Sequence, residues 1–231
     1  TDSPDLRVRC NAAQSLANLL TQEPNRAALF AIPDAVGRFA ALSCAKVVPG
    51  TRVQPGGVLV MRAATLAMAQ LANSQTVENK RRFMDTGLIR PICRLTRSED
   101  KATRMAAARG VLWLCQSPGN SRDKWHRSQD VTPLGWTTEQ LSEAVRAAAS
   151  PDAQVTTQIL LGFRCICTAV NSGNMLARTE ILAILSSSLR GELFQDNFPL
   201  LMAALGLVAV LAEFPWPSDM LDAGLHEPLL T

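Results

Sequence analysis

An alanine-rich helical segment recurs along this chain, and that repetition constrains the fold more than any other feature. Three clear copies occupy residues 9–19, 61–71 and 104–114, and weaker copies occupy 158–170 and 200–212. Their alanines and leucines recur at the spacing of a helix that buries one face. The second and third copies lie 43 residues apart, which is a period typical of helical repeat proteins. One such unit cannot bury its apolar face alone, so we expect the copies to stack.

The amino-acid composition favours an all-α chain. Tyr is absent and aromatic residues make up 5% of the sequence, whereas sheets favour aromatic and β-branched side chains. Hydrophobic residues make up 47% of 231 residues, which is enough for a substantial core. We therefore predict a single repeat domain over 1–231, with about five units.

Gly and Pro mark the boundaries between the predicted helices. Residues 85–92 and 222–229 share the pattern Asp-x-Gly-Leu-x-x-Pro-aliphatic. Gly would end one helix in the left-handed region, and Pro would open the first turn of the next. Two polar stretches near 46–58 and 117–138 contain Pro and Gly and are predicted to be inserted loops. Thr138 is the expected N-cap of the helix that follows the second loop.

The repeated units resemble armadillo repeats (ARM/HEAT-like). The resemblance rests on the Leu-Ala-Asn-Leu segment at 16–19 followed by Asn25, and on Leu-Ala-Asn at 71–73 followed by Asn79 and Gly-Leu-Ile at 87–89. It implies a right-handed α-solenoid of three-helix repeats, whose third helices line a concave groove that binds extended peptides or partner domains.

The resemblance also indicates candidate partner-binding residues. In relatives such as importin-alpha, a Trp and an Asn four residues apart on successive third helices grip a peptide. The same register here gives the pairs Gln14/Asn18, Leu66/Gln70, Arg109/Trp113 and Leu161/Cys165. Only Asn18 keeps the Asn, so a repeated groove for nuclear signals is not expected. The candidates from this register are Gln14, Asn18, Gln70, Arg109 and Trp113, and packing of Trp113 against the next repeat is the alternative.

Charge is distributed unevenly along the sequence. Residues 78–109 hold nine basic and four acidic residues, and no Lys or Arg follows Arg190. Arg81 and Arg82 are therefore candidates for binding an acidic or phosphorylated partner. The alternative is that the basic region is an ordinary solvated surface.

The sequence offers little for catalysis. Its only two histidines are His126 and His226, and it has no Cys-x-x-Cys pair and no phosphate-binding loop. We therefore expect no enzyme activity, no bound metal and no cofactor. The apolar segment 198–212 is shorter than a membrane span, which predicts a buried helix. Six cysteines in apolar stretches suit an intracellular, reducing compartment, most simply the cytoplasm, although a processed organellar protein remains open.

The predicted function is a protein–protein interaction scaffold or adaptor, including a role as one subunit of a larger complex. It would bind another protein or an extended peptide through the groove and the inserted loops. Two alternatives remain open: a chaperone-type adaptor, which fold analogy suggests, and a nucleic-acid binder with a basic groove. Trp125 and Trp136 would either anchor a partner or pin the second loop to the repeats.

Overall fold

The structure is a computed structural model, and the regular secondary structure in the part of the chain that it describes is helical. That part comprises residues 3–32, 34–38, 55–116, 136–167, 180–190, 197–213, 222 and 225. No strand occurs among these residues, which agrees with the all-α prediction. The chain divides into two compact units, Thr1–Leu114 and Cys115–Thr231.

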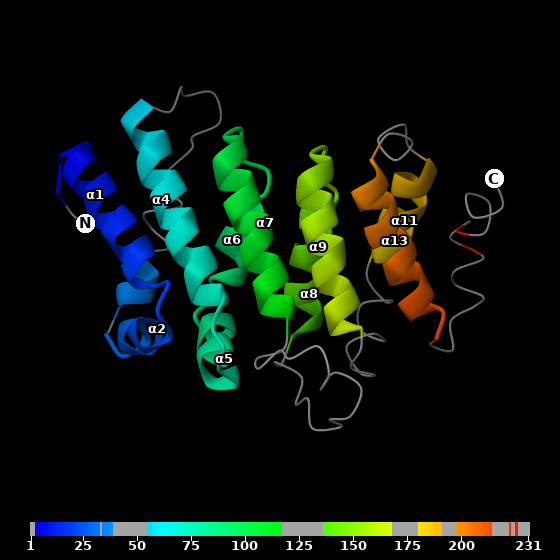
Figure 1. The fold of residues 1–231 in the computed structure, drawn as a ribbon, viewed down its shortest axis with the longest axis horizontal. Helices are drawn as coiled ribbons and strands as arrows, with labels where there is room; N and C mark the ends of the chain where they lie inside the picture. The colour runs from blue at the N-terminus through cyan, green and yellow to red at the C-terminus, as the bar shows by residue number, and fades with distance from the viewer. Residues whose placement is uncertain are drawn as a thin grey trace. The chain divides into compact units, whose positions relative to one another are not determined.

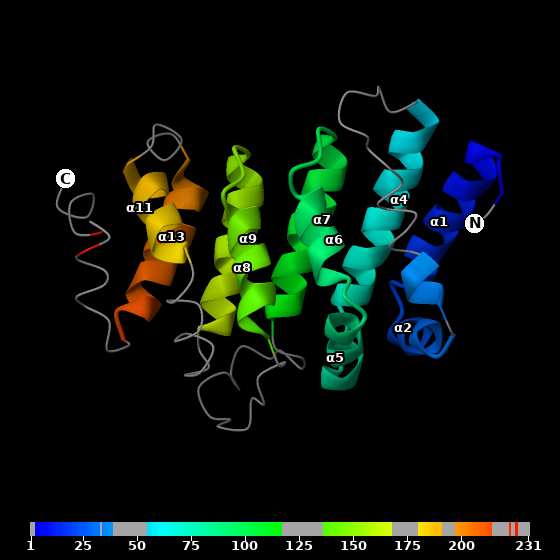
Figure 2. The same cartoon turned by 180° about the vertical axis from the view of Figure 1, so that it is seen from behind.

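Three long helices lie side by side in the N-terminal unit, and shorter helices connect them (Figure 1). The short helix α6 lies behind α4 and α7 in Figure 1 and in front of them in Figure 2. The helices are α1 (Leu6–Leu19), α2 (Glu23–Phe30), α4 (Pro55–Ala72), α5 (Val77–Asp85), α6 (Ile89–Leu95) and α7 (Lys101–Cys115). The three sequence copies therefore form α1, α4 and α7, which correspond to the third helices of the repeats.

The C-terminal unit pairs long and short helices in a similar way. Its described helices are α8 (Thr138–Ala148), α9 (Ala153–Ile166), α11 (Ile181–Arg190) and α13 (Phe198–Leu211). Helix α9 packs against both α8 and α13, and α11 packs against α13. The weaker sequence copies thus form α9 and α13.

Local signals place most helix boundaries where the sequence predicts them. Gly87 has a φ of 73°, the left-handed conformation expected after α5. Pro91 lies in the first turn of α6. Leu88 and Leu225, which follow the Gly in the two copies of the motif, are both buried. In the first copy, at 85–92, the motif therefore combines a helix stop with an apolar anchor.

Two predicted boundaries need correction. Thr137, not Thr138, is the N-cap of α8: its hydroxyl accepts from the Gln140 amide, and the Gln140 side chain accepts from the Thr137 amide. Thr138 lacks this reciprocal partner because Leu141 stands three residues after it. Helix α4 begins at Pro55, so the end of the first predicted loop is helical. The remainder of that loop, and 117–135 of the second, lie outside the described residues.

Small residues allow the long helices to approach closely. A Cβ added at Gly110 of α7 would collide with Ile92 Cδ1 and would lie 3.2 Å from the Ala69 Cα of α4. Leu71 of α4 and Leu114 of α7 stand 43 residues apart and are both fully buried. The helices therefore pack through a repeated pattern of small residues beside leucine.

Arg26 links the first repeat to the second at the ends of their long helices. Its guanidinium donates to the Leu20 and Thr21 carbonyls just after α1, at 2.7 and 2.9 Å, and to the Asn73 carbonyl just after α4, at 2.6 Å. These carbonyls have no partner within their helices. Because Arg26 is 4% exposed, the link is protected from solvent.

Glu23 completes this link by binding the start of α5. Its carboxylate accepts hydrogen bonds from the Ser74 hydroxyl, the Gln75 amide and the Asn79 side chain, and it pairs with Arg26 at 2.7 Å. Burial opposes ionisation, but these hydrogen bonds outweigh it and lower the pKa of Glu23 from 4.5 to about 2. One carboxylate thereby joins α2, the end of α4 and α5.

We predict that Leu71→Ala and Leu114→Ala each lower the free energy of unfolding by about 2–5 kcal/mol, because each empties a fully buried position. Leu59→Ala is the matched control, since Leu59 is 49% exposed on α4. Urea unfolding measures all three. Equal small losses at Leu71, Leu114 and Leu59 would contradict the repeat packing.

We predict that the stabilising effect of Glu23 depends on pH. Its pKa is lowered on folding, so its contribution is complete above the unfolded value of 4.5 and disappears as the pH falls through about 2. The difference in unfolding free energy between the wild type and Glu23→Gln should therefore shrink over this range. A difference that stays constant with pH would show that the charge of Glu23 is not responsible.

Candidate partner-binding face

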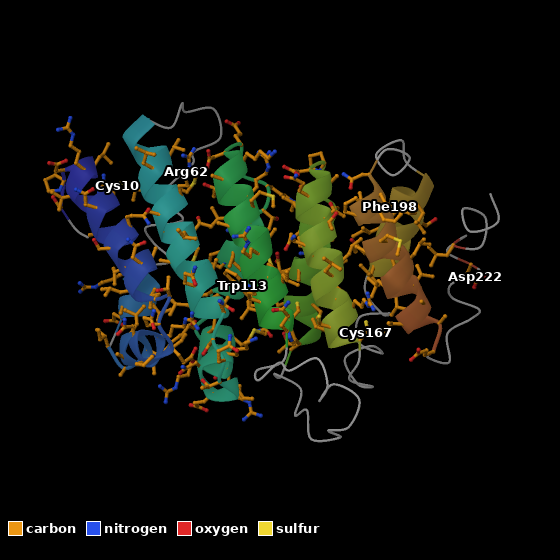
Figure 3. The ribbon with its side chains drawn as sticks, in the orientation of Figure 1. Cys10, Arg62, Trp113, Cys167, Phe198 and Asp222 are labelled. Carbon is orange, nitrogen blue, oxygen red and sulfur yellow. The ribbon has the colours of Figure 1, made fainter. Side chains whose placement is uncertain are left out.

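One side of each long helix in the N-terminal unit remains accessible and forms the candidate binding surface. On α4 these residues recur every three or four positions, and the residues 43 later on α7 and 52 earlier on α1 are accessible too. We call these twelve residues the third-helix face: Arg7, Cys10, Gln14, Asn18, Leu59, Arg62, Leu66, Gln70, Ala102, Met105, Arg109 and Trp113. Figure 3 labels Cys10, Arg62 and Trp113, one on each of the three helices.

Arg109 and Trp113 form the most specific feature of this face. The Arg109 guanidinium carbon lies 5.9 Å from the centre of the Trp113 ring, within the range of a cation–π interaction. Arg109 is exposed and Trp113 is half-buried. The pair thus holds a cation over an aromatic plane, with the guanidinium still able to reach a ligand.

A buried lysine donates a hydrogen bond to the backbone carbonyl of this tryptophan. Lys80 of α5 is 2% exposed, and its ammonium donates to the Trp113 carbonyl near the end of α7. A cation at this position suits the negative end of the helix dipole. Lys80 is one of the nine basic residues in 78–109, and its burial places it in the packing between repeats rather than on the surface.

The glutamine and asparagine candidates are also on the face. Gln14 donates from its amide nitrogen to the Asn18 side-chain oxygen at 3.2 Å, and both residues are exposed. Gln70 occupies the position on α4 that Asn18 occupies on α1 and is half-buried. The structure therefore brings Gln14, Asn18, Gln70, Arg109 and Trp113 to one side of the unit, as their register predicts.

Arg81 and Arg82 lie elsewhere, on α5. Both are exposed, and Arg82 pairs with Glu78 at 2.9 Å, one turn earlier in the same helix. Helix α5 lies beyond the end of α4 and does not join the row of long helices (Figure 1). These two arginines therefore form a separate group from the third-helix face.

Arg62 belongs to the face, although the sequence did not single it out. Its guanidinium forms a two-pronged pair with the Asp100 carboxylate, at 2.6 and 3.1 Å. Asp100 also accepts from the Thr103 amide and hydroxyl at the start of α7. The hydrogen bond from Arg62 leads the interactions that hold the pKa of Asp100 well below its usual range. The only sequence signal for this contact is the capping pattern Asp-x-x-Thr at 100–103, which places Asp100 at the start of a helix.

The remaining predicted features contribute less. Trp136 is 6% exposed, so its interpretation as an exposed anchor is wrong; Trp125 lies outside the described residues. Cys10, Cys93, Cys115, Cys165 and Cys167 form no disulfide, and burial raises the pKa of the Cys167 thiol to about 12. Cys44 is outside the described part.

The described ranges hold neither a cluster of metal-ligating side chains nor a membrane-spanning helix. No group of three or more His, Cys, Asp and Glu residues there is placed to hold a metal ion. No described helix combines the length and apolar character needed to cross a bilayer. The apolar segment near the C-terminal end forms α13, which is 14 residues long.

Comparison with solved structures identifies the fold. No protein-family model and no curated protein matches the chain. Three designed armadillo repeat proteins match it with TM-scores of 0.64, 0.65 and 0.66 and identities of 15%, 15% and 16%. Each match covers 99% of this chain and 87% of the designed one, and one of these proteins was solved in complex with the peptide (KR)4. The chain therefore has an armadillo-like repeat fold, a class that commonly binds peptides or proteins.

We predict that Lys80→Met lowers the free energy of unfolding by about 1–3 kcal/mol, because the Trp113 carbonyl loses its cationic donor. Lys101→Met is the matched control, since Lys101 is exposed at the start of α7 and should cost little. Urea unfolding of both variants measures the difference. Equal effects would mean that the contact of Lys80 with the end of α7 contributes no stability.

Proposed function

We propose that this chain is a non-enzymatic scaffold or adaptor that binds an extended, acidic segment of another protein across the third-helix face. The observation that carries the proposal is the cation–π pair of Arg109 and Trp113 on an accessible face. Arg and Trp are the residue types that most often anchor protein interfaces. The free energy of binding would come mainly from such a centre, with the surrounding residues providing fit.

The charge of the face supports an acidic ligand. Arg7 and Arg109 contribute one arginine each from α1 and α7, and none of the twelve residues is Asp or Glu, whereas Arg62 of α4 is already paired with Asp100. Arginine binds carboxylate and phosphate groups through two parallel hydrogen bonds. The designed protein solved with (KR)4 holds a basic peptide, whereas the arginines here favour the opposite charge.

Several basic residues of the region 78–109 form contacts within the protein. Lys80 serves the end of α7, Arg82 pairs with Glu78, and Arg104 donates to the Ser98 and Glu99 carbonyls at 2.9 and 2.8 Å. These contacts reduce the positive charge available to a long polyanion, which makes a nucleic acid the weaker candidate. The cysteines without disulfides support an intracellular location for the partner.

We predict that Arg109→Glu weakens the binding of the acidic probe peptide (Asp-Glu)4 by roughly tenfold, about 1.4 kcal/mol. Fluorescence anisotropy with labelled (Asp-Glu)4 and (Lys-Arg)4 measures this, and wild type should prefer the acidic peptide. Since the interaction is electrostatic, the effect should shrink as salt rises. The double variant Arg81→Glu, Arg82→Glu tests the separate group on α5 and should have a smaller effect.

Arg94→Glu is the matched control, because Arg94 is exposed on α6, outside the third-helix face, and the change in charge is the same. Circular dichroism should show that all variants keep their helical signal. Equal losses for Arg94→Glu and Arg109→Glu would indicate general charge attraction and refute the face. Tighter binding of generic RNA than of (Asp-Glu)4, with a steep salt dependence, would favour the nucleic-acid alternative.

A further inference from the structure

Helix α4 provides the middle of the third-helix face, because it lies between α1 and α7 (Figures 1 and 2). Its contributions to the face are Leu59, Arg62, Leu66 and Gln70. Leu59 is 49% exposed and Leu66 is half-buried. The two leucines are seven residues apart, so they lie on one side of the helix, two turns from each other. The middle of the face therefore presents apolar side chains to a ligand.

The one charged residue that α4 adds to the face is neutralised within the protein. The Arg62 guanidinium donates to both carboxylate oxygens of Asp100, at 2.6 and 3.1 Å. The same carboxylate accepts from the Thr103 amide and hydroxyl at the start of α7. An arginine that is bound by two parallel hydrogen bonds to a carboxylate has little capacity for a second anion. The α4 part of the face therefore favours an apolar side chain of the ligand over a charged one.

An unneutralised cation lies on either side of α4. Arg7 of α1 and Arg109 of α7 are both exposed, and within the described ranges neither guanidinium takes part in a salt bridge. Arg109 lies over the Trp113 ring, an interaction that leaves its N–H groups available to a carboxylate. Across α1, α4 and α7, the face therefore presents a cation, an apolar region and a second cation.

The separation of the helices sets the spacing that a ligand must have. Packed helices lie about 8–10 Å apart, so α1 and α7, with α4 between them, are about 16–20 Å apart. In the repeat register Arg7 is equivalent to Leu59 and Arg109 to Leu66, which adds an offset of about 10 Å along the helices. An extended chain spans about 3.3 Å per residue. An extended segment that reaches from one cation to the other therefore needs roughly six residues.

We propose that the segment bound by this face carries apolar side chains midway between two acidic positions that are about six residues apart. The acidic positions pair with Arg7 and Arg109, and the apolar side chains between them pack on Leu59 and Leu66. This inference rests on the proposed function and specifies which acidic segments the face selects. Charge attraction alone would accept any acidic chain, whereas burial of apolar surface adds a preference that salt does not screen.

Three peptides of equal length and charge test the pattern. The flanked peptide is Glu-Glu-Ser-Leu-Leu-Ser-Glu-Glu, the serine peptide has Ser in place of both Leu, and the one-sided isomer is Leu-Leu-Ser-Ser-Glu-Glu-Glu-Glu. Fluorescence anisotropy measures the affinity of each labelled peptide for the full chain. Wild type should bind the flanked peptide roughly fivefold more tightly than the serine peptide, because leucine side chains become buried. It should also bind the flanked peptide more tightly than the isomer, which cannot reach both cations.

Variants of the apolar region provide the second test. Leu59→Ser combined with Leu66→Ser should bind the flanked and serine peptides equally and should still bind (Asp-Glu)4, because both arginines remain. Leu59→Ser alone should reduce the preference and serves as the test if circular dichroism shows that the double variant is unfolded. Leu19→Ser is the matched control, since Leu19 is 56% exposed on α1 outside the face, and it should keep the wild-type preference. Arg7→Glu should weaken the flanked peptide more than the isomer.

The proposal is overturned if wild type binds the flanked and serine peptides equally, or if it binds the isomer as tightly as the flanked peptide. A loss of preference in Leu19→Ser as large as in Leu59→Ser would assign the leucines of the peptide to another surface. Failure of the proposed function would look different, because Arg109→Glu would then leave the binding of (Asp-Glu)4 unchanged. Failure of this inference alone would keep that effect of Arg109→Glu and remove only the contribution of the peptide leucines.

Discussion

The N-terminal unit depends on cations that reach from a short helix to the carbonyl end of the next long helix. Arg26 follows Asn25 and bonds to the Asn73 carbonyl; Lys80 follows Asn79 and bonds to the Trp113 carbonyl. The two cations occupy the same place in successive repeats. Each neutralises groups that a helix end leaves without a partner. Both cations are buried, so breaking either link would leave the charge buried without a partner or move it into solvent. The links therefore fix the positions of neighbouring long helices along their axes.

Because the long helices are fixed along their axes, the residues on their accessible side form a regular surface. Residues at equivalent positions on α1, α4 and α7 come into line only if the helices do not slide. Ala69 against Gly110 sets their spacing, and Arg62 with Asp100 ties α4 to the start of α7. An interface needs such preorganisation because ordering flexible side chains on binding reduces affinity. The armadillo-like fold thus supplies a rigid frame, and specificity rests with the side chains on it.

The same repetition sets the character of the sides on which neighbouring long helices meet. The side of a long helix that packs against another repeat must be apolar and built from small residues, as Ala64 and Ala67 of α4 are. Val8 and Leu19 of α1 are also apolar, and they are 49% and 56% exposed. The proposed binding site on the third-helix face would therefore use the side of the long helices that this packing leaves accessible.

The sequence alone determined the repeats, the all-helical class, the Gly87 turn and the register that relates equivalent positions on α1, α4 and α7. These follow from local periodicity and backbone preference, which are encoded within a few turns of helix. It could not show that Lys80 is buried while Arg81 and Arg82 are exposed, nor that Trp136 is packed. Adjacent basic residues look alike in a sequence. Only the tertiary structure decides which of them meets a distant carbonyl, because that contact depends on a helix more than 30 residues away.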